Sequence, residues 1–368
     1  MGEAITYVGI DAHKRELQLA MLVGDEEQPR CWTSPTESTA IDRLRRRLER
    51  DAPGAIECCY EAGPGGYALQ RQLGSDRIRC RVIAPSLIPR TPGDRVKTNR
   101  RDARKLAGFL RAGLLTEVRP PTLAEEAVRD LCRARDDARG DLLRSRHRLG
   151  KLLLRRGLIY HGTNWTKRHR EWLDQLPWPH VAERHVMRDY RLAIGQIEAR
   201  ITEVDRLLEP LAAEPPYGAA VAALRCFRGF ETVTAMMILA ELHEMRRFPH
   251  APALMAFIGL VPSEDSTGDR RRPGAITKMG NGLVRRLLIQ AAWHYRHEPR
   301  LSAPLQRRRA GQPLAILAMA EKAEQRLCRR YRRLCARQKP KPLVITAIAR
   351  ELAGFLWAVL QRPESAMT

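Results

Sequence analysis

The segment DRVKTNRRDARKLA, residues 94–107, places Asp102 inside a dense field of lysine and arginine side chains. Asn99 lies one helical turn before Asp102, and residues three apart share a helix face. Two oxygen ligands in a cationic surrounding suit a divalent metal ion that grips a phosphate. The surrounding basic residues are Lys97, Arg100, Arg101, Arg104 and Lys105. A solvated basic helix with one incidental acid has the same pattern, so this segment leaves both interpretations open.

Two further acids occur where apolar runs end. Asp11 ends the run YVGID, and Glu61 precedes the turn GPGG. Carboxylates at strand ends and helix starts can converge on one sheet edge, where they could hold one or two Mg²⁺ ions. We therefore predict an RNase H-like metal centre of Asp11, Glu61 and Asp102, with Asn99 as a neighbouring ligand. Glu57 competes with Glu61, but it lies in mid-strand without the glycine-rich turn.

A second candidate site is Ser266, in a polar loop far from these acids in the sequence. Its hydroxyl could attack phosphorus if a metal ion or a base activated it, while nearby arginines held the phosphate. On residue chemistry alone, such a loop more often binds phosphate without covalent chemistry. The polar and basic residues that follow it are Arg270, Arg271, Arg272, Lys278, Asn281, Arg285 and Arg286.

Two other segments suggest contact with nucleic acid. Residues 224–242 resemble a helix-hairpin-helix, with Gly229 as the turn whose backbone amides could meet a DNA phosphate. Residues 326–341 carry eight basic side chains and no acid. A run of like charge usually marks a solvated face, but the total charge of the chain favours nucleic-acid contact.

The first 120 residues have the pattern of an α/β domain. Apolar, β-branched runs predict strands at 5–10, 17–23, 55–60 and 80–84, with a hairpin between the first two. Residues 67–73 are predicted to form a helix. Strands that alternate with helices indicate a sheet flanked by helices, which we assign to a domain at 1–120.

The rest of the chain is predicted to be mainly helical. Thr122 and Glu125 form a capping box at the start of a helical pattern of about 35 residues. A loop rich in tryptophan and proline follows, and helix returns over 184–211. An antiparallel helical hairpin, a dimerising coiled-coil arm and an ordinary amphipathic pair all fit this pattern. The proline-rich segment near 215 predicts a boundary between an arm, 121–215, and a C-terminal domain, 216–368.

The composition points to a polyanionic partner. The 368-residue chain has a formal net charge of +23, spread along its length, and such a field attracts DNA or RNA. We find no apolar run of membrane-spanning length and no signal peptide. The eight cysteines form no CxxC pair and indicate reduced thiols in a cytoplasmic protein.

Taken in order, several segments resemble the "one-ten" family of bacterial insertion-sequence transposases over nearly the whole chain. They are YVGIDAHK, YEAGPGGYAL, GDRVKTNRRDARKLAGFLRAG, FRGFETVTA, AFIGLVPSEDSTGDRRRPGAITKMGN and RRLLIQAAWHYRH. The resemblance implies a RuvC-like, RNase H-like N-terminal domain with an acidic DEDD set, a helical coiled-coil middle, and a mainly α C-terminal domain with a catalytic serine. The DEDD positions fall on Asp11, Glu61, residue 99 and Asp102, and the serine falls on Ser266. Asn99 stands where the family often has aspartate, which predicts a weaker or single-metal site.

The resemblance also implies a mechanism and partners. Ser266 would attack a DNA phosphodiester, aided by Mg²⁺, and form a covalent phosphoserine. A structured non-coding RNA would choose donor and target DNA, and a dimer or tetramer near the bacterial nucleoid would share composite active sites. Two alternatives stay open: a Mg²⁺-dependent junction nuclease without a covalent intermediate, and a non-catalytic nucleic-acid-binding relative.

Overall fold

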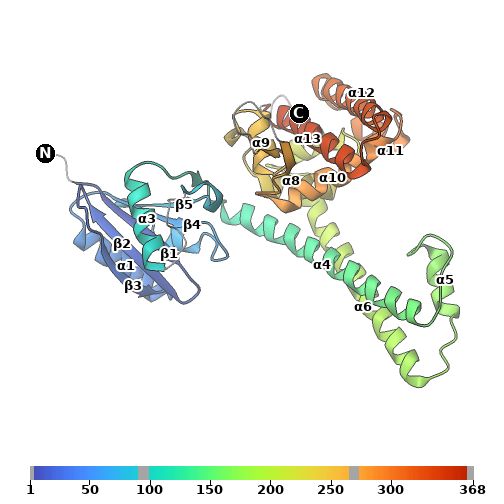
Figure 1. The fold of residues 1–368 in the computed structure, drawn as a ribbon, viewed down its shortest axis with the longest axis horizontal. Coiled ribbons are helices and arrows are strands. Elements are labelled where there is room, and N and C mark those ends of the chain that lie inside the picture. Colours follow the sequence, from blue (N-terminus) through green and yellow to red (C-terminus); the bar gives the residue numbers. More distant parts are fainter. Residues whose placement is uncertain (1–3, 90–98, 265–272, 363–368) are drawn as a thin grey trace. The chain divides into compact units, whose positions relative to one another are not determined.

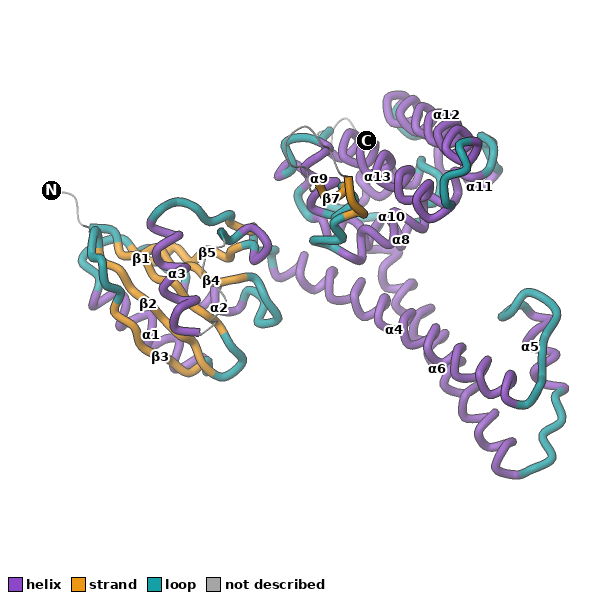
Figure 2. The backbone as a smooth tube through the Cα atoms, in the orientation of Figure 1, coloured by secondary structure: helices purple, strands orange, loops and turns teal. Residues whose placement is uncertain are grey.

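A computed structural model describes residues 4–89, 99–264 and 273–362 of the chain (Figure 1). The chain divides into two compact units, Met1–Pro121 and Thr122–Thr368, and each is described by itself. Strands gather in the first unit, whereas helices make up most of the second (Figure 2). The boundary expected at 215/216 falls within the second unit and stays a prediction.

The first unit is built on a mixed sheet, which has six strands in the described residues, in the order β3-β2-β1-β4-β5-β6. Strands β1, β4 and β5 are parallel, and the remaining neighbours are antiparallel. The strands are Thr6–Ala12 (β1), Glu16–Val23 (β2), Arg30–Pro35 (β3), Ile56–Glu61 (β4), Ile78–Ile83 (β5) and Glu117–Val118 (β6). The predicted hairpin is confirmed, because the amide of His13 donates to the carbonyl of Glu16 at 3.0 Å between β1 and β2.

Helices cover both faces of this sheet. Val8 and Ile10 of β1 pack in one core with Leu44 and Leu48 of α1. On the other face, Ala103 and Ala107 of α3 pack with Ala20 and Leu22 of β2. The helices are Ser38–Asp51 (α1), Ala68–Leu73 (α2), the 3₁₀ turn Pro85–Leu87 (η1) and Asn99–Arg111 (α3). Strands buried on both faces read as continuous apolar runs, which is why the sequence revealed the central strands.

Several elements of the first unit were not predicted, among them β3 and α1, the short strand β6 and the 3₁₀ turn η1. Strand β3 lies at the sheet edge, and most of its side chains are at least partly exposed, so it lacks an apolar run. Helix α1 buries a stripe formed by Ile41, Leu44 and Leu48 between many charged residues. Its amphipathic spacing was present in the sequence, but the high charge of the segment obscured it.

The second unit begins with an antiparallel helical hairpin, which we call the arm. Thr122 caps helix α4, Leu123–Arg155, and forms the predicted capping box with Glu125. Helix α6, Val181–Leu211, packs along α4, and ion pairs join Arg135 to Asp205 and Arg146 to Glu198. The segment predicted as a tryptophan- and proline-rich loop contains a further short helix, Lys167–Gln175 (α5), so that part of the prediction was wrong. The side chain of Thr166 accepts from the amide of His169, which explains why α5 starts there.

The rest of the second unit is a helical bundle with a small β-hairpin, which has the strands β7 and β8 in the described residues. Its elements are Gly218–Arg225 (α7), Thr232–Leu242 (α8), Met245–Arg247 (η2), Ala251–Phe257 (α9), Pro262–Glu264 (β7), Pro273–Ile276 (β8), Gly282–Ala292 (α10), Trp293–Arg296 (η3), Ala303–Arg309 (α11), Leu314–Ala336 (α12) and Lys341–Leu360 (α13). Helix α13 packs against α9, α10 and α12, and its apolar side chains join the largest core.

The sequence analysis found no apolar run of membrane-spanning length, but helix α13 is long and apolar enough to cross a membrane by length and composition. Half of its most apolar window is buried in the bundle. Val344, Ile348 and Leu352 are fully enclosed by protein. The hydrophobic character of α13 is therefore explained by its place at the centre of the bundle.

Candidate active site

Asp11 and Glu61 stand level on neighbouring parallel strands. Strands β1 and β4 pair in register from Thr6 with Ile56 to Ile10 with Tyr60. Asp11 and Glu61 are each the next residue along their strand, and each lies within the strand bounds. The carboxyl ends of parallel strands meet at one sheet edge, so both acids belong to the same edge, which we call the acidic edge.

Both side chains also belong to the face of the sheet that α3 covers. The thiol of Cys59 donates to the carbonyl of Leu106 in α3, at 3.7 Å. A Cβ added to Gly9 would meet the same helix. Successive residues of a strand alternate between faces, so Asp11 and Glu61, two residues further on, share the face of Gly9 and Cys59.

Helix α3 starts at the acidic edge. At its other end, the guanidinium of Arg111 donates to the carbonyls of Gly24 and Glu26. Gly24 in turn bonds to the carbonyl of Ile5, just before β1 begins. The last turn of α3 therefore lies beside the start of β1, and its first turn, with Asn99 and Asp102, lies toward the end where β1 finishes.

The electrostatics of the edge combine carboxylates with cations. Asp11 and Asp102 are partly buried, whereas Glu61 and Asn99 are exposed. The first turn of a helix also presents unpaired amides and the positive end of the helix dipole. These features can draw a phosphate toward a site that carboxylates alone would repel. The exposed guanidiniums of the first two turns of α3 belong to Arg100, Arg101 and Arg104.

His13 is a neighbour that the sequence analysis missed. Its Nε2 lies 3.1 Å from Oδ2 of Asp11, at the turn of the β1–β2 hairpin. The segment IDAHK carried the signal, since a histidine two residues after a strand-end acid can turn back to it. An imidazole hydrogen-bonded to a carboxylate fixes the position of that carboxylate.

The donor types at the acidic edge fit a magnesium ion, because carboxylate and amide oxygens are the ligands that Mg²⁺ takes from proteins. The described residues nevertheless include no group of three or more His, Cys, Asp or Glu side chains close enough together to hold a metal ion. The backbone thus brings Asp11, Glu61 and Asp102 to one edge of one face, while their carboxylates do not form a closed ligand cluster.

The predicted serine site lies largely outside the described residues. Ser266, Arg270, Arg271 and Arg272 are not described, and neither is Lys97 in the first unit. The described strands β7 and β8, which precede and follow residues 265–272 in the sequence, pair antiparallel as a β-hairpin.

Residues just after this hairpin hold the bundle together. Oδ1 of Asn281 accepts from the amide of Val284 at 2.9 Å and caps α10, while its Nδ2 donates to Oε2 of Glu241 at 2.7 Å. Arg285 donates to the carbonyls of Ile258 and Met279, each at 2.9 Å. Through these contacts Asn281 and Arg285 connect elements of the bundle. Contact of either residue with nucleic acid stays a prediction.

The remaining predicted nucleic-acid contacts differ in exposure. Arg286 donates to Asp136 of α4 at 2.5 Å, whereas Lys278 is exposed. Gly229 lies in the turn between α7 and α8 at φ +83°, and a Cβ there would be 2.7 Å from the backbone of Ala291. Glycine is therefore required at 229 for both conformation and close packing, and its contact with a DNA phosphate stays a prediction.

Glu241 is a second residue that the sequence analysis missed. Its side chain is only 3% exposed, and it accepts two hydrogen bonds from Arg133 of α4, at 2.6 and 3.0 Å. Together with the bond from Asn281, this buried carboxylate ties the arm to the start of α10. Its place within the apolar helix α8 was the available signal, since a buried acid needs partners.

Two family models match the chain. Residues 8–156 match a transposase family described as DEDD_Tnp_IS110, and residues 221–306 match the family described as "Transposase IS116/IS110/IS902 family". The first match covers the sheet with the acidic edge, from the third residue of β1 onward, and all of α4. It identifies the first unit as an RNase H-like DEDD domain, which implies an active site that depends on a divalent metal.

Curated relatives agree with these matches. The chain is 40% identical over 358 residues to "Putative transposase y4qE" of Sinorhizobium fredii, covering 96% of this chain and 88% of that protein. It is 33% identical over 342 residues to "Transposase for insertion sequence element IS1533" of Leptospira borgpetersenii, covering 90% and 97%. The resemblance to the one-ten family is confirmed: the chain belongs to the IS110/IS116/IS902 family of transposases, which are DNA-binding and DNA-cutting enzymes.

Proposed function

We propose that this transposase is an RNA-guided DNA recombinase that cuts and rejoins DNA through a covalent bond to Ser266. The observation that carries the metal part of the proposal is the level position of Asp11 and Glu61 on β1 and β4, beside the first turn of α3. Asp11, Glu61 and Asp102 would hold Mg²⁺, with Asn99 supplying a neutral oxygen. A bound Mg²⁺ would neutralise the developing charge on the phosphate oxygens.

In the proposed reaction, the Oγ of Ser266 attacks the phosphorus of a DNA phosphodiester. A bond forms between Oγ and phosphorus as the bond from phosphorus to the leaving strand oxygen breaks, and the hydroxyl proton passes to that oxygen. The product is a phosphoserine and a free strand end, and the reverse exchange with another strand end releases the serine. No net hydrolysis occurs, so the phosphodiester energy is kept for rejoining.

The family resemblance extends the proposal to partners. Base pairing with a structured non-coding RNA would select donor and target DNA, and the protein would read backbone and shape. A dimer or tetramer would combine the acids of one protomer with the serine of another. The two-helix arm supports this part, because Leu143 and Leu154 of α4 are 50% and 57% exposed there.

The test is a search for the protein–DNA adduct. The protein is expressed with its native flanking DNA, the lysate is denatured, and DNA that stays attached to the polypeptide is measured. We expect an adduct that Ser266→Ala abolishes while DNA and RNA binding persist. Cut DNA with hydrolysed ends and no adduct would instead establish the metal-dependent nuclease.

A non-catalytic relative is the second candidate, and Asn99 is the observation that favours it. An amide in place of a carboxylate removes one negative charge from the acidic edge and weakens attraction for a cation. This candidate predicts neither adduct nor cut DNA. It also predicts no calorimetric uptake of Mg²⁺ that depends on Asp11 and Asp102.

A further inference from the structure

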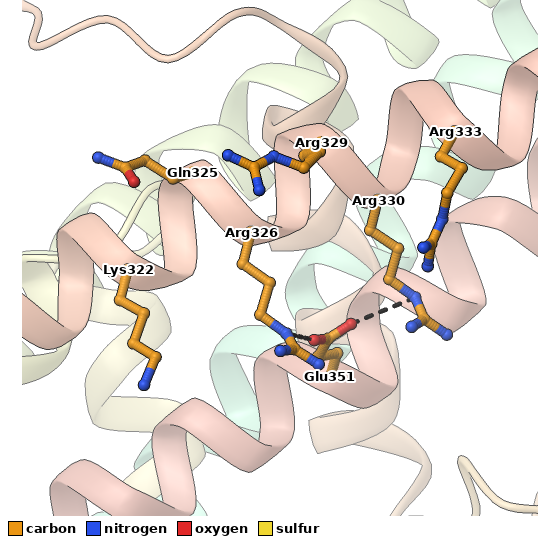
Figure 3. Close-up of a pocket in the computed structure, with 7 residues that line it drawn as sticks. All are labelled: Lys322, Gln325, Arg326, Arg329, Arg330, Arg333 and Glu351. Carbon is orange, nitrogen blue, oxygen red and sulfur yellow. Dashed lines mark hydrogen bonds and ion pairs between the residues drawn. The ribbon is translucent and has the colours of Figure 1, made fainter.

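The bundle contains a cationic cleft between α12 and α13, which is remote in sequence from both candidate sites. The α12–α13 cleft has a volume of about 430 Å³. Its lining residues are Lys322, Gln325, Arg326, Arg329, Arg330, Arg333 and Glu351 (Figure 3). Five of these seven side chains are cations and one is a carboxylate, so the cleft concentrates positive charge.

Four of the five cations of the cleft follow one stripe of α12. Lys322, Arg326 and Arg330 are spaced four residues apart, and Arg333 follows three residues later, so all four share a helix face. Figure 3 shows them extending toward the side on which Glu351 of α13 lies. At a rise of about 1.5 Å per residue, the stripe is roughly 16 Å long. One strand of B-DNA presents a phosphate about every 3.4 Å of axis, so the stripe spans about five phosphates.

Glu351 fixes two of these guanidiniums. Its carboxylate pairs with Arg326 and lies 3.2 Å from Nε of Arg330. The Glu351 side chain is 16% exposed, whereas those of Arg326 and Arg330 are 61% and 36% exposed. The carboxylate is therefore sheltered behind guanidiniums that still reach solvent. This arrangement holds planar donors in place, which favours contact with phosphate over a freely moving charge.

The other three cations have no acidic partner among the described residues: Lys322, Arg329 and Arg333 are exposed and join no ion pair there. Cations crowded at one cleft repel each other, and a polyanion relieves this repulsion while it releases its own counterions. A merely solvated basic face would need neither the hollow nor the partly buried carboxylate behind it.

We propose that the α12–α13 cleft binds the phosphate backbone of duplex DNA. DNA is the partner because this family binds DNA, and the inference does not depend on the chemistry of Ser266 or on RNA guidance. Lys322, Arg329 and Arg333 supply free charge, Arg326 and Arg330 supply oriented donors, and Glu351 is a positioning residue. Failure of the serine mechanism would therefore leave this inference intact. Failure of DNA binding at the α12–α13 cleft would likewise leave the serine mechanism untouched.

The test measures equilibrium binding of the full-length protein to a fluorescein-labelled 30-base-pair DNA duplex across a salt series. The first variant combines Lys322→Gln, Arg329→Gln and Arg333→Gln, whose exposed side chains leave the fold intact. The logarithm of the binding constant falls linearly with the logarithm of the salt concentration, and each lost phosphate contact makes this slope less steep by about 0.9. We expect the slope to become less steep by about two to three, and affinity at 100 mM salt to fall more than tenfold.

A matched control removes the same charge elsewhere in the second unit. Lys167, Arg144 and Arg206 are exposed on the arm helices, and their triple replacement by glutamine also removes one lysine and two arginines. We expect this control to change the slope by less than one. Equal losses in both triple variants would show a general charge effect and would overturn the cleft as a site.

Glu351→Gln separates positioning from charge. Removing a negative charge strengthens DNA binding if the cleft acts through net charge alone, whereas it weakens binding if Glu351 orients Arg326 and Arg330. We expect at least threefold weaker binding, with circular dichroism showing an unchanged fold. Tighter binding by Glu351→Gln would overturn the positioning role. No loss of DNA affinity in the first triple variant, or a loss confined to an RNA hairpin probe, would overturn DNA as the occupant.

Discussion

Gly9 of β1 lies so close to Ala103 of α3 that no side chain fits between them. A Cβ on Gly9 would be 2.2 Å from the carbonyl oxygen of Ala103 and 2.4 Å from the amide nitrogen of Ala107. Asp11 lies two residues after Gly9, and Asp102 immediately precedes Ala103. The contact between glycine and helix therefore sets how near the acid of the helix comes to the acids of the sheet.

Gly9→Ala is expected to push α3 away from the sheet and to lower both stability and DNA cutting. Overpacking of a close contact costs about 1–3 kcal/mol, measured by denaturant unfolding of the purified protein. The matched control is Gly108→Ala on α3, where an added Cβ meets nothing within 4 Å. That control should be neutral or slightly stabilising, by about 0.5–1 kcal/mol. A stable Gly9→Ala protein with normal cutting would refute the positioning role of this contact.

Replacing the acids of the edge should abolish cutting without abolishing DNA binding. We expect Asp11→Asn, Glu61→Gln and Asp102→Asn each to slow strand cleavage by at least about 100-fold, as loss of an electrostatic contribution to a transition state does. Glu57→Gln is the control, because Glu57 also lies on β4 but pairs with Arg81 at 2.7 Å. If Glu57→Gln slowed strand cleavage as much as Glu61→Gln does, the choice of Glu61 as the site acid would be wrong.

Asn99→Asp tests whether the amide weakens the site. An added carboxylate at the start of α3 raises the negative charge available to a cation and also suits the positive end of the helix. We expect calorimetry to show tighter Mg²⁺ binding by about tenfold, and cleavage to require less Mg²⁺. The matched replacement Thr98→Asp adds the same charge one residue earlier. Equal effects from both variants would indicate general attraction and no ligand role for position 99.

Glu241→Ala should loosen the arm from the bundle. The change removes the bonds from Arg133 and Asn281 to a buried carboxylate, and the loss of a hydrogen bond to a charged group costs about 1–3 kcal/mol. Glu203→Ala removes an exposed pair with Arg206 on the arm, and such a solvent-screened surface pair contributes little to stability. Thermal unfolding of both variants provides the comparison. Similar melting temperatures would show that Glu241 is not a structural tie.

The tip of the arm should lose stability in mild acid. Burial, reinforced by the neighbouring Arg170, lowers the pKa of His169, and its Nδ1 accepts from the amide of Trp165 at 3.1 Å. With the folded pKa below the unfolded value, the contribution of His169 is complete above about pH 6.5 and is lost as the pH falls toward the folded pKa. Unfolding of the arm measured by tryptophan fluorescence between pH 8 and 5 checks this.

The control for the pH experiment is the exposed neighbour His161. His161→Asn should keep the acid sensitivity of the arm, whereas His169→Asn should reduce it because an amide does not take up a proton in this range. If the pH profile stayed the same in His169→Asn, another group would be responsible.

The sequence by itself determined the family, the α/β class of the first unit and the capped start of α4. Asp11 and Glu61 could be proposed as site acids because strands β1 and β4 are buried on both faces, so their apolar runs and the acids that end them stand out in the chain. The register of β1 and β4 confirms only that the two residues lie at one sheet edge. The capping box of Thr122 is a local interaction between residues three apart, which needs no tertiary contact.

Tertiary structure decided what depends on residues that are distant in the chain. Three such features join separate segments of the chain. They are the hydrogen bond from Asn281 to Glu241, the strand register that places Asp11 opposite Glu61, and the direction of α3. Periodicity reports which face of an element is buried, but it does not report what covers that face. For the same reason a basic run could suggest nucleic acid, while only the packing of α12 on α13 showed Glu351 behind its arginines.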